Sequence, residues 1–388
     1  MRNSPQFGHT RRADFLLADG VDHLNHGSFG ATPRVVLAAA AEWRERMEAD
    51  PTTFFRRDLV PGLRSAAGRV AVLLGGAGAD WAFVENATSG LNAIIASLAP
   101  TLGPGDQILC LSQVYNAIGN ALRYYAERAG AHVVTLEVPV PFVDPAPLLA
   151  SLAKAIGPHT RLAVFDHITS AGAVVLPVRE MAALCRERGV PVAIDGAHAP
   201  GQITLDVPAL GVDWYVGNLH KWAFAARGAG VVWCAPERQQ ALHPTSISHA
   251  LGAGFPDEFD YTGTRDNSAW LAVPAALDYL DGLGAEAMRA HNAGLARDAG
   301  ALLAGAWGSE TAAAPEYRAA MVSVRLPGAF VKDRDGARRL AARLSEEHGI
   351  TAGVMVLDGS LWIRVSAQVY NEIGDYCRLA AIGRRLAE

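Results

Sequence analysis

Short, almost continuously apolar runs alternate with helix-length segments over the first two thirds of the chain. Each run is rich in Val, Ile, Leu or aromatic residues and predicts a strand. The predicted strands are 81–86, 107–112, 132–138, 161–168, 191–197, 213–218 and 228–235, and helices are expected at 89–99, 116–129, 144–156 and 178–189. Continuous apolarity is typical of strands buried on both faces. We therefore predict an α/β fold with a mainly parallel seven-stranded sheet and helices on both of its faces.

The pattern changes after Arg265, where Ala-rich helical segments lead into a mixture of helices and shorter strands. This texture predicts a second, smaller α+β domain at the C-terminal end. Helices are expected there at 268–282, 285–305, 333–348 and 371–387, and strands near 320–326 and 361–366. The predicted organisation is an N-terminal segment, 1–24, that packs with the small domain, then a large domain, 25–266, and the small domain, 267–388.

Composition and charge agree with a globular chain of this kind. With 388 residues and 50% hydrophobic content, the chain can bury one large core and a smaller one. Its net charge is −5 and its pI about 6.2, and it contains no block of Lys and Arg that could follow a phosphate backbone. We expect no nucleic-acid partner.

The four cysteines are far apart in the sequence, with no CxxC pair and no Cys/His cluster at metal-ligand spacing. We therefore expect neither a metal site nor a disulfide framework, and a reducing compartment. The first twenty residues lack the apolar core of a signal peptide, and no apolar run approaches the roughly 20 residues of a membrane helix. The expected location is the cytoplasm, without membrane attachment.

Polar residues come directly after three of the predicted strands, at the sheet edge where ligands of open α/β sheets bind. The first strand leads into 86-NATSGLN-92, where Thr88 and Ser89 precede a helix. Hydroxyls and free amides at a helix N-terminus can hold an anion, although simple N-capping would use the same residues. Asp195 ends the fifth strand, and its burial demands a cationic partner such as a protonated pyridine nitrogen or an arginine, unless it caps a turn.

Lys221 comes after the sixth strand and is surrounded in sequence by aromatic residues. A surface lysine is the ordinary alternative, but burial would lower the pKa of the amine and let it attack a carbonyl group. An anion site, a carboxylate and a lysine, each at the end of a predicted strand, are the contacts that pyridoxal phosphate requires. We therefore expect this cofactor.

The order of the motifs 86-NATS-89, 195-DGAH-198 and 218-NLHKW-222 resembles the fold-type I pyridoxal phosphate enzymes of the aminotransferase class V group. The isopenicillin N epimerase-like branch is the most similar, on the segments 24-LNHGSFGATP-33, 261-YTGTRDNSAW-270 and 364-RVSAQVYN-371. The resemblance runs from about residue 23 to the C-terminus.

The resemblance implies a role for each matching position. Lys221 would form the Schiff base, Asp195 would bind the pyridine nitrogen, and His198 would lie toward the ring's O3′, where a core histidine is the alternative. Tyr115 would stack on the ring. The implied phosphate contacts are Ala87, Thr88, Ser89, Asn218 and His220, with Asn218 standing where desulfurases carry a hydroxyl residue.

Further positions bear on the substrate and on assembly. Gly263 and Thr264 resemble a segment that reaches the phosphate of the neighbouring subunit, which implies a homodimer with the active site at the interface. Arg364 resembles the arginine that grips the substrate α-carboxylate, a role that suits a bidentate donor. Asn25 and His26 would border the substrate cavity. Two arginines, at 56 and 57, either receive a second acidic group of the substrate or form a solvated helix face.

These residues predict an enzyme that acts at the Cα of an amino acid, with Lys221 as the general base. Epimerisation is our first expectation, and it needs a second acid, for which Tyr115 and His26 are the candidates. The alternatives are a C–S β-lyase of a cysteine-derived substrate, an aminotransferase, or a degenerate binding module that has lost catalysis. A persulfide-forming desulfurase is excluded, because no cysteine lies between Cys234 and Cys377 to take the sulfur.

Overall fold

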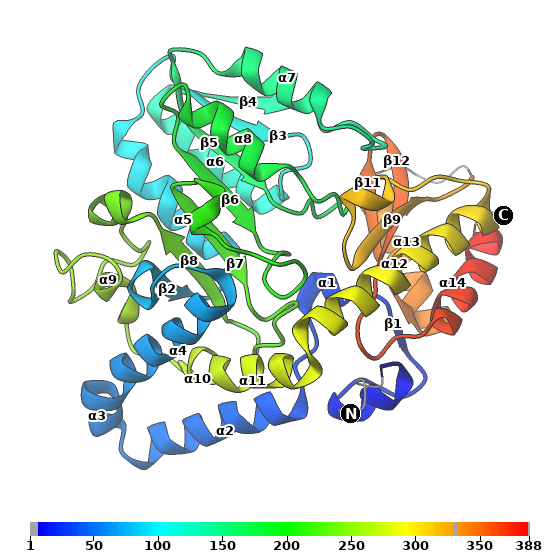
Figure 1. Ribbon diagram of the computed structural model, residues 1–388, viewed down its shortest axis with the longest axis horizontal. Helices are drawn as coiled ribbons and strands as arrows, with labels where there is room; N and C mark the ends of the chain where they lie inside the picture. The colour runs from blue at the N-terminus through cyan, green and yellow to red at the C-terminus, as the bar shows by residue number, and fades with distance from the viewer. Residues whose placement is uncertain (1–6, 329–332, 387–388) are drawn as a thin grey trace.

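A seven-stranded mixed sheet forms the centre of the larger part of the molecule (Figure 1). The computed structural model describes residues 7–328 and 333–386. The strand order is β2-β8-β7-β6-β5-β3-β4, and only β8 runs antiparallel to its neighbours. The strands are β2 (Trp81–Val84), β3 (Gln107–Leu111), β4 (His132–Leu136), β5 (Thr160–Asp166), β6 (Val192–Gly196), β7 (Trp214–Asn218) and β8 (Gly230–Cys234). All seven predicted strands and the mainly parallel sheet are confirmed.

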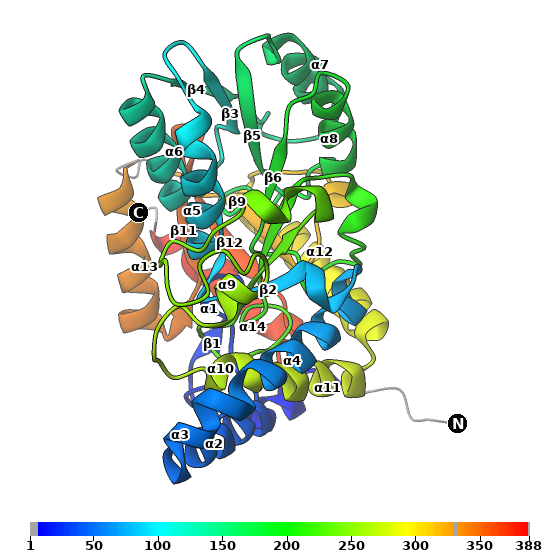
Figure 2. The same ribbon diagram turned by 90° about the vertical axis from the view of Figure 1, so that its left-hand side faces the viewer.

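Helices cover both faces of this sheet, as Figure 2 shows. α5 (Ala87–Leu98) and α6 (Asn116–Ala129) lie on one face, and α7 (Ala146–Ala155) and α8 (Val178–Arg186) lie on the other. In β5, Leu162 and Val164 join the core on the α5 side, while Ala163 and Phe165 join the core on the α8 side. Because side chains alternate along a strand, burial on both faces makes the sequence of each strand apolar throughout.

Helices that were not predicted from the sequence precede the sheet. They are α2 (Arg34–Ala49), the single turn α3 (Pro51–Thr53), a π-helical turn (Phe54–Asp58) and α4 (Leu59–Leu74). Leu63 and Val70 of α4 are fully buried in the core on the α8 side of the sheet. After the last strand, α9 (Asp257–Asp260), α10 (Ser268–Leu271) and α11 (Val273–Leu283) complete this part.

The smaller part is built on a three-stranded antiparallel sheet of order β11-β12-β9. Its strands are β9 (Met321–Arg325), β11 (Gly353–Leu357) and β12 (Ser360–Ser366), and its helices are α12 (Ala285–Trp307), α13 (Arg334–His348) and α14 (Ile373–Leu386). Strand β11 was not predicted, although Asp358 and Gly359 between β11 and β12 both have positive φ and carry the Asp-Gly signal of a tight hairpin. Within the described residues, no helix is long and apolar enough to cross a membrane.

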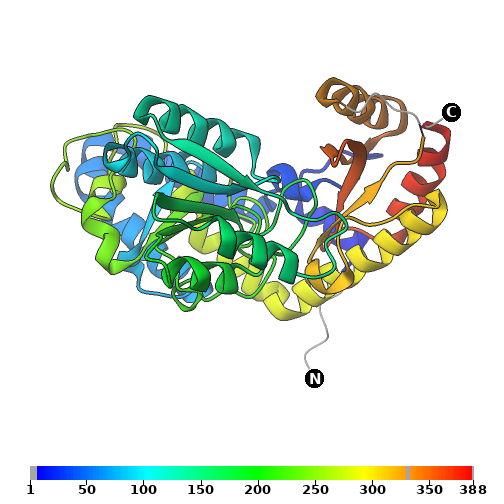
Figure 3. The same ribbon diagram turned by 90° about the horizontal axis from the view of Figure 1, so that it is seen from above.

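The N-terminal segment contacts both parts of the molecule, since Phe15 belongs to the large core while other residues of the segment bond to the smaller part. β1 (Asp22–His23) pairs in parallel with β10 (Ile350–Thr351), and His9 bonds to Asp375 of α14. The predicted domain limit at 266–267 stays a prediction. Leu271 and Leu277 belong to the large core, whereas Leu303 of α12 belongs to the small one. On this packing we propose a boundary inside α12, the long helix that connects the two parts in Figure 3.

One close approach fixes the turn after β7, which contains Lys221. The short helix α1 (His26–Phe29) ends at Gly30, whose φ is +69°. A Cβ atom at residue 30 would collide with the carbonyl oxygen of His220 and press on Lys221 Cα. Only glycine combines this left-handed backbone with the lack of a side chain, so the end of α1 and the turn fit together through this residue.

We expect Gly30→Ala to lower the free energy of unfolding clearly more than Gly20→Ala. Gly20 also has positive φ, +74°, but it has open space around its Cβ position. Both variants carry the left-handed penalty of ~1–2 kcal/mol, and only Gly30→Ala adds a collision that costs about 1–3 kcal/mol more. Equal losses in chemical denaturation would contradict the close fit described here.

Candidate active site

A cavity of about 470 Å³ opens at the carboxyl ends of β5, β6 and β7. Its lining residues come from several separate stretches of the chain: Ser28, Phe29, Asn86, Ala87, Thr88, Ser89, Tyr115, Asp166, Ile168, Ser170, Asp195, Ala197, His198, Asn218, His220 and Lys221. The structure thus brings together every residue that the sequence analysis assigned to the cofactor within one chain. The remaining predicted residues do not line the cavity: Asn25, His26, Gly263, Thr264 and Arg364.

The anion site lies at the start of α5. Asn86 caps the helix, because its Oδ1 accepts the Ser89 backbone N–H at 3.0 Å. Asn218 at the end of β7 accepts the Ala87 N–H at 2.8 Å, so the helix end is tied to the neighbouring strand. The Thr88 and Ser89 side chains line the cavity beside a helix N-terminus. Such a terminus favours an anion, and a phosphate fits this place.

Lys221 is almost fully buried, and its Nζ lies 3.4 Å from Nε2 of His198. Burial and, to a smaller extent, the nearby guanidinium of Arg364 lower the pKa of Lys221 to about 7, against the opposing effect of Asp195. The amine is therefore partly neutral at neutral pH, the state in which it can attack an aldehyde.

Asp195 and His198 lie beside the lysine on the turn after β6. Burial raises the pKa of Asp195, while the Ala197 N–H, 3.0 Å from Oδ1, and Lys221 lower it. The turn cap considered in the sequence analysis is therefore present, but Asp195 forms no ion pair with an arginine within the described residues. Burial holds the pKa of His198 well below its usual range, and Nδ1 of His198 is buried without a described partner.

The Asp195 carboxylate, which has no ion-pair partner among the described residues, and Nδ1 of His198, which has no hydrogen-bond partner there, test whether pyridoxal phosphate fits. A pyridinium nitrogen would give Asp195 a direct ion pair, which no described residue forms with it. A ring hydroxyl oxygen would give the neutral imidazole of His198 a partner. His220 also lines the cavity, with Nδ1 3.1 Å from the carbonyl oxygen of Ala229, so Nδ1 donates, and Nε2 could donate to a phosphate once the ring takes up a second proton. The residues present therefore fit the cofactor.

His26 occupies a different position from the one expected. It is fully buried outside the cavity lining, with Nε2 2.9 Å from the carbonyl oxygen of Lys221 and Nδ1 2.9 Å from the Tyr370 hydroxyl. Nε2 also lies 3.1 Å from the Gln368 amide nitrogen, but the contact with the Lys221 carbonyl is shorter, and since a carbonyl only accepts, we assign the proton to Nε2 and let Nδ1 accept from Tyr370. Burial lowers the pKa of His26 to about 3, so the ring is neutral. In this structure His26 bonds to the backbone of the turn that contains Lys221, on the side away from the cavity.

Arg364 is buried just behind the cavity wall, and not exposed as a strand residue of the small sheet would ordinarily be. Its neighbours on β12, Ile363 and Val365, point into the small core, so Arg364 points the opposite way. Its guanidinium donates to Ser28 Oγ at 2.8 Å and to the Ser170 carbonyl at 2.7 Å. Asn25 also contacts this group, with Oδ1 3.2 Å from one nitrogen.

Several lining residues were not predicted from the sequence, of which Asp166 and the two serines are chemically the most significant. Asp166 ends β5 in register with Asp195 on β6. It lies inside an apolar run and not beyond its end, so it does not stand out as a polar residue at a strand end. Ser28 and Ser170 carry no motif of their own, and it is their contact with Arg364 that marks them.

Gly263, Thr264 and the two arginines lie on the surface of the single chain. Thr264 is exposed, and its hydroxyl is 2.8 Å from the Tyr261 hydroxyl. The role of Gly263 and Thr264 across a subunit interface stays a prediction. Arg56 and Arg57 are exposed, and Arg57 pairs with Asp58, as a solvated helix face would. Neither arginine lines the cavity.

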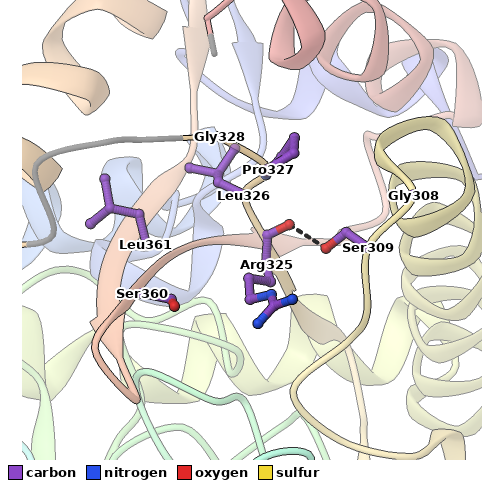
Figure 4. Close-up of a pocket in the computed structure, with 8 residues that line it drawn as sticks. All are labelled: Gly308, Ser309, Arg325, Leu326, Pro327, Gly328, Ser360 and Leu361. Carbon is purple, nitrogen blue, oxygen red and sulfur yellow. Dashed lines mark hydrogen bonds between the residues drawn. The ribbon is translucent and has the colours of Figure 1, made fainter.

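A second hollow, of about 230 Å³, lies at the edge of the small sheet (Figure 4). Among the described residues that line it, Arg325 has the one charged side chain. The backbone carbonyl of Arg325 accepts a hydrogen bond from the Ser309 hydroxyl. The described residues there offer no nucleophile beside a base and no buried carboxylate, so the candidate chemistry belongs to the cavity around Lys221.

Comparison with known proteins agrees with this geometry. A family model described as aminotransferase class-V matches residues 30–372. The putative L-cysteine desulfhydrase 1 of Oryza sativa subsp. japonica is 36% identical, over 95% of this chain and 84% of the relative. The isopenicillin N epimerase of Streptomyces clavuligerus is 34% identical, over 95% of this chain and 96% of the relative.

Solved structures share the fold. The apo cysteine desulfurase of Thermococcus onnurineus NA1 superposes with a TM-score of 0.82 at 18% identity, over 98% of both chains. The cystine C–S lyase C-DES, in complex with its product cysteine persulfide, gives 0.79 at 23% identity, over 95% of this chain and 98% of its own. With the family model spanning most of the sequence, this chain belongs to the aminotransferase class V family and is a pyridoxal phosphate-dependent enzyme.

Proposed function

We propose that the enzyme is a C–S β-lyase that converts L-cysteine or a β-substituted cysteine, with water, to pyruvate, ammonia and the released thiol or sulfide. The observation that carries this proposal is that Lys221 is the one amine among the described lining residues, and its pKa is about 7. A β-elimination needs a single base and a leaving group. The desulfhydrase and epimerase relatives have similar identities, 36% and 34%, and the desulfhydrase is slightly nearer.

Binding of the cofactor depends on the groups around the cavity. Lys221 would hold the aldehyde carbon, Asp195 the ring nitrogen, and the start of α5, with Thr88 and Ser89, the phosphate. When bound, pyridoxal phosphate supplies an electron-accepting ring that weakens the bonds at the substrate Cα. The hydrogen bond from the Ala87 N–H to Asn218 keeps the anion site at a fixed place relative to the turn that contains Lys221.

Substrate recognition depends on Arg364. Its guanidinium lies behind Ser28 and Ser170, both of which line the cavity, so an α-carboxylate there can replace the serine contacts with a bidentate pair. The same guanidinium acts on the pKa of Lys221. Arg364 would therefore hold the carboxylate close enough to the lysine for the Cα proton to reach Nζ.

Lys221 then does the proton transfer. Its neutral Nζ takes the Cα proton, and the electron pair of the C–H bond forms a double bond to Cβ as the C–S pair leaves with sulfur. The protonated amine can return this proton to the departing sulfur. No cysteine is among the described lining residues, and Cys110, Cys185 and Cys234 are buried elsewhere. The sulfur thus leaves as a free thiol or sulfide and is not transferred to the protein.

Epimerisation is the second candidate, and one observation favours it. Tyr115 lines the cavity and is half exposed, so it could reprotonate Cα from a direction different from that of Lys221. The other acid considered in the sequence analysis, His26, lies outside the lining with both ring nitrogens engaged. The loss of this candidate, together with the desulfhydrase relatives, places the lyase first in our proposal.

We expect the purified holoenzyme to form pyruvate and sulfide from L-cysteine. Proton NMR in D2O measures the pyruvate formed and the exchange of the Cα proton. Lys221→Ala should lose at least about a thousandfold in rate, because the base is removed. Lys154→Ala, which changes a lysine in the last turn of α7, away from the cavity, is the control and should keep full activity. Exchange of the Cα proton with loss of optical purity and no pyruvate would instead identify an epimerase.

The pKa of Lys221 gives a pH prediction for the apoenzyme. Because only the neutral amine attacks the aldehyde, the rate of cofactor attachment should rise with pH through about 7 and not near the usual lysine range. Arg364→Met removes a positive neighbour and should move the midpoint to higher pH. Stopped-flow absorbance measures both rates. A midpoint above about pH 9 in the unmodified protein, closer to the ordinary lysine value, would contradict the burial of the amine.

We also propose a homodimer in which Gly263 and Thr264 reach the phosphate of the partner. Thr264→Ala should then raise the dissociation constant of the cofactor severalfold while the dimer persists in analytical ultracentrifugation. Thr101→Ala, at an exposed threonine, serves as the control. A monomer with full activity would rule out this arrangement.

A further inference from the structure

Asp166 and Asp195 form a pair of buried carboxyl groups at the bottom of the cavity. They are direct partners in the parallel register of β5 and β6, so their side chains leave the sheet on the same face. Both line the cavity, and Asp166 is 3% exposed. Its Oδ2 is buried without a hydrogen-bond partner among the described residues.

Two negative charges on adjacent strands in a place of low dielectric repel strongly, so the pair is expected to carry one proton. Asp195 is the better site for the negative charge, because Lys221 lies near it and the Ala197 N–H bonds to it. Burial and then Asp195 raise the pKa of Asp166 well above its usual value, and only backbone amides, its own and that of Tyr115, oppose this.

Among the described residues, no cation acts on the pKa of Asp166 to reverse this order; the guanidinium of Arg123 on α6 acts on the neighbouring Cys110 and not on Asp166. Burial raises the pKa of the Cys110 thiol on β3, and Asp166 is close enough to raise it as well, so the thiol is neutral. Residues 87–98 of α5, which covers this face, contain no ionisable side chain. Asp166 itself forms no ion pair among the described residues.

We propose that Asp166 is a positioning residue that stays protonated beside an ionised Asp195, so that the pair presents a single negative charge to the ring nitrogen of the cofactor. A second charge there would favour the protonated form of Lys221 and repel the substrate carboxylate. The neutral acid avoids both effects while filling the space next to Asp195. This role is independent of which bond the enzyme breaks.

The test uses holoenzyme with ¹³C-labelled aspartate carboxyl groups, studied by NMR at about pH 8, far above the ordinary aspartate pKa. We expect one aspartate to remain protonated at that pH and its signal to be lost in Asp166→Asn. Asp260, whose pKa is about 6, would already be ionised there and cannot imitate the signal. Asp19→Asn, at an exposed aspartate, is the control and should leave the signal in place.

Absorbance of the bound cofactor gives a second readout. The unmodified enzyme should show an alkaline spectral step as Asp166 ionises, and Asp166→Asn should lack this step while matching the unmodified spectrum at neutral pH. Absence of any protonated aspartate in the unmodified enzyme in the NMR experiment would overturn the proposal even if Asp166→Asn failed to fold. An acidic step lost in Asp166→Asn would overturn it as well. Neither measurement requires turnover, so failure of the lyase proposal would leave both interpretable.

Discussion

The burial of one amine, Lys221, is the constraint on which the rest of the site depends. A charged ammonium group is costly to remove from water, so the surrounding chain must either neutralise it or shift its pKa. Here the surrounding chain shifts the pKa of Lys221: burial lowers it, and Arg364 lowers it as well. The turn that carries Lys221 must therefore be held rigidly, since exposure of the amine to water would return its pKa to the ordinary lysine value.

That rigidity comes from parts of the chain that are distant in sequence. His26 donates to the Lys221 carbonyl, Gly30 permits contact with the turn, and Phe224, with φ of +61°, closes it in a conformation unusual for a side chain of that size. The Phe224 ring packs between Phe15 and Tyr279, which stabilises the strained backbone. The stretch from Phe15 to Gly30 is thus part of the support of the cofactor lysine, although none of the three supporting residues, His26, Gly30 and Phe224, lines the cavity.

The sheet and the strand-end residues could be predicted from the sequence because each arose from a local pattern. Continuous apolar runs marked the strands, and the polar residues after them lie at one edge. Other features depended on tertiary contacts. Arg364 lies on a strand whose alternation would leave it facing solvent, and only the large part of the molecule buries it. The helix α4 did carry a usable signal, since Leu59, Leu63, Val70 and Leu74 share one face.

The contacts of Arg364 bear on how the enzyme discriminates between ligands. Its guanidinium donates to Ser28, Ser170 and Asn25. A ligand that binds Arg364 must therefore replace the hydrogen bonds that the guanidinium makes to the two serines. A neutral amide or ester gains little binding free energy from this exchange, because its oxygen is an acceptor similar to the serine oxygens. A carboxylate gains the difference between a charged and a neutral acceptor. If Arg364 holds the substrate carboxylate as we propose, a free amino acid binds in preference to a residue within a peptide.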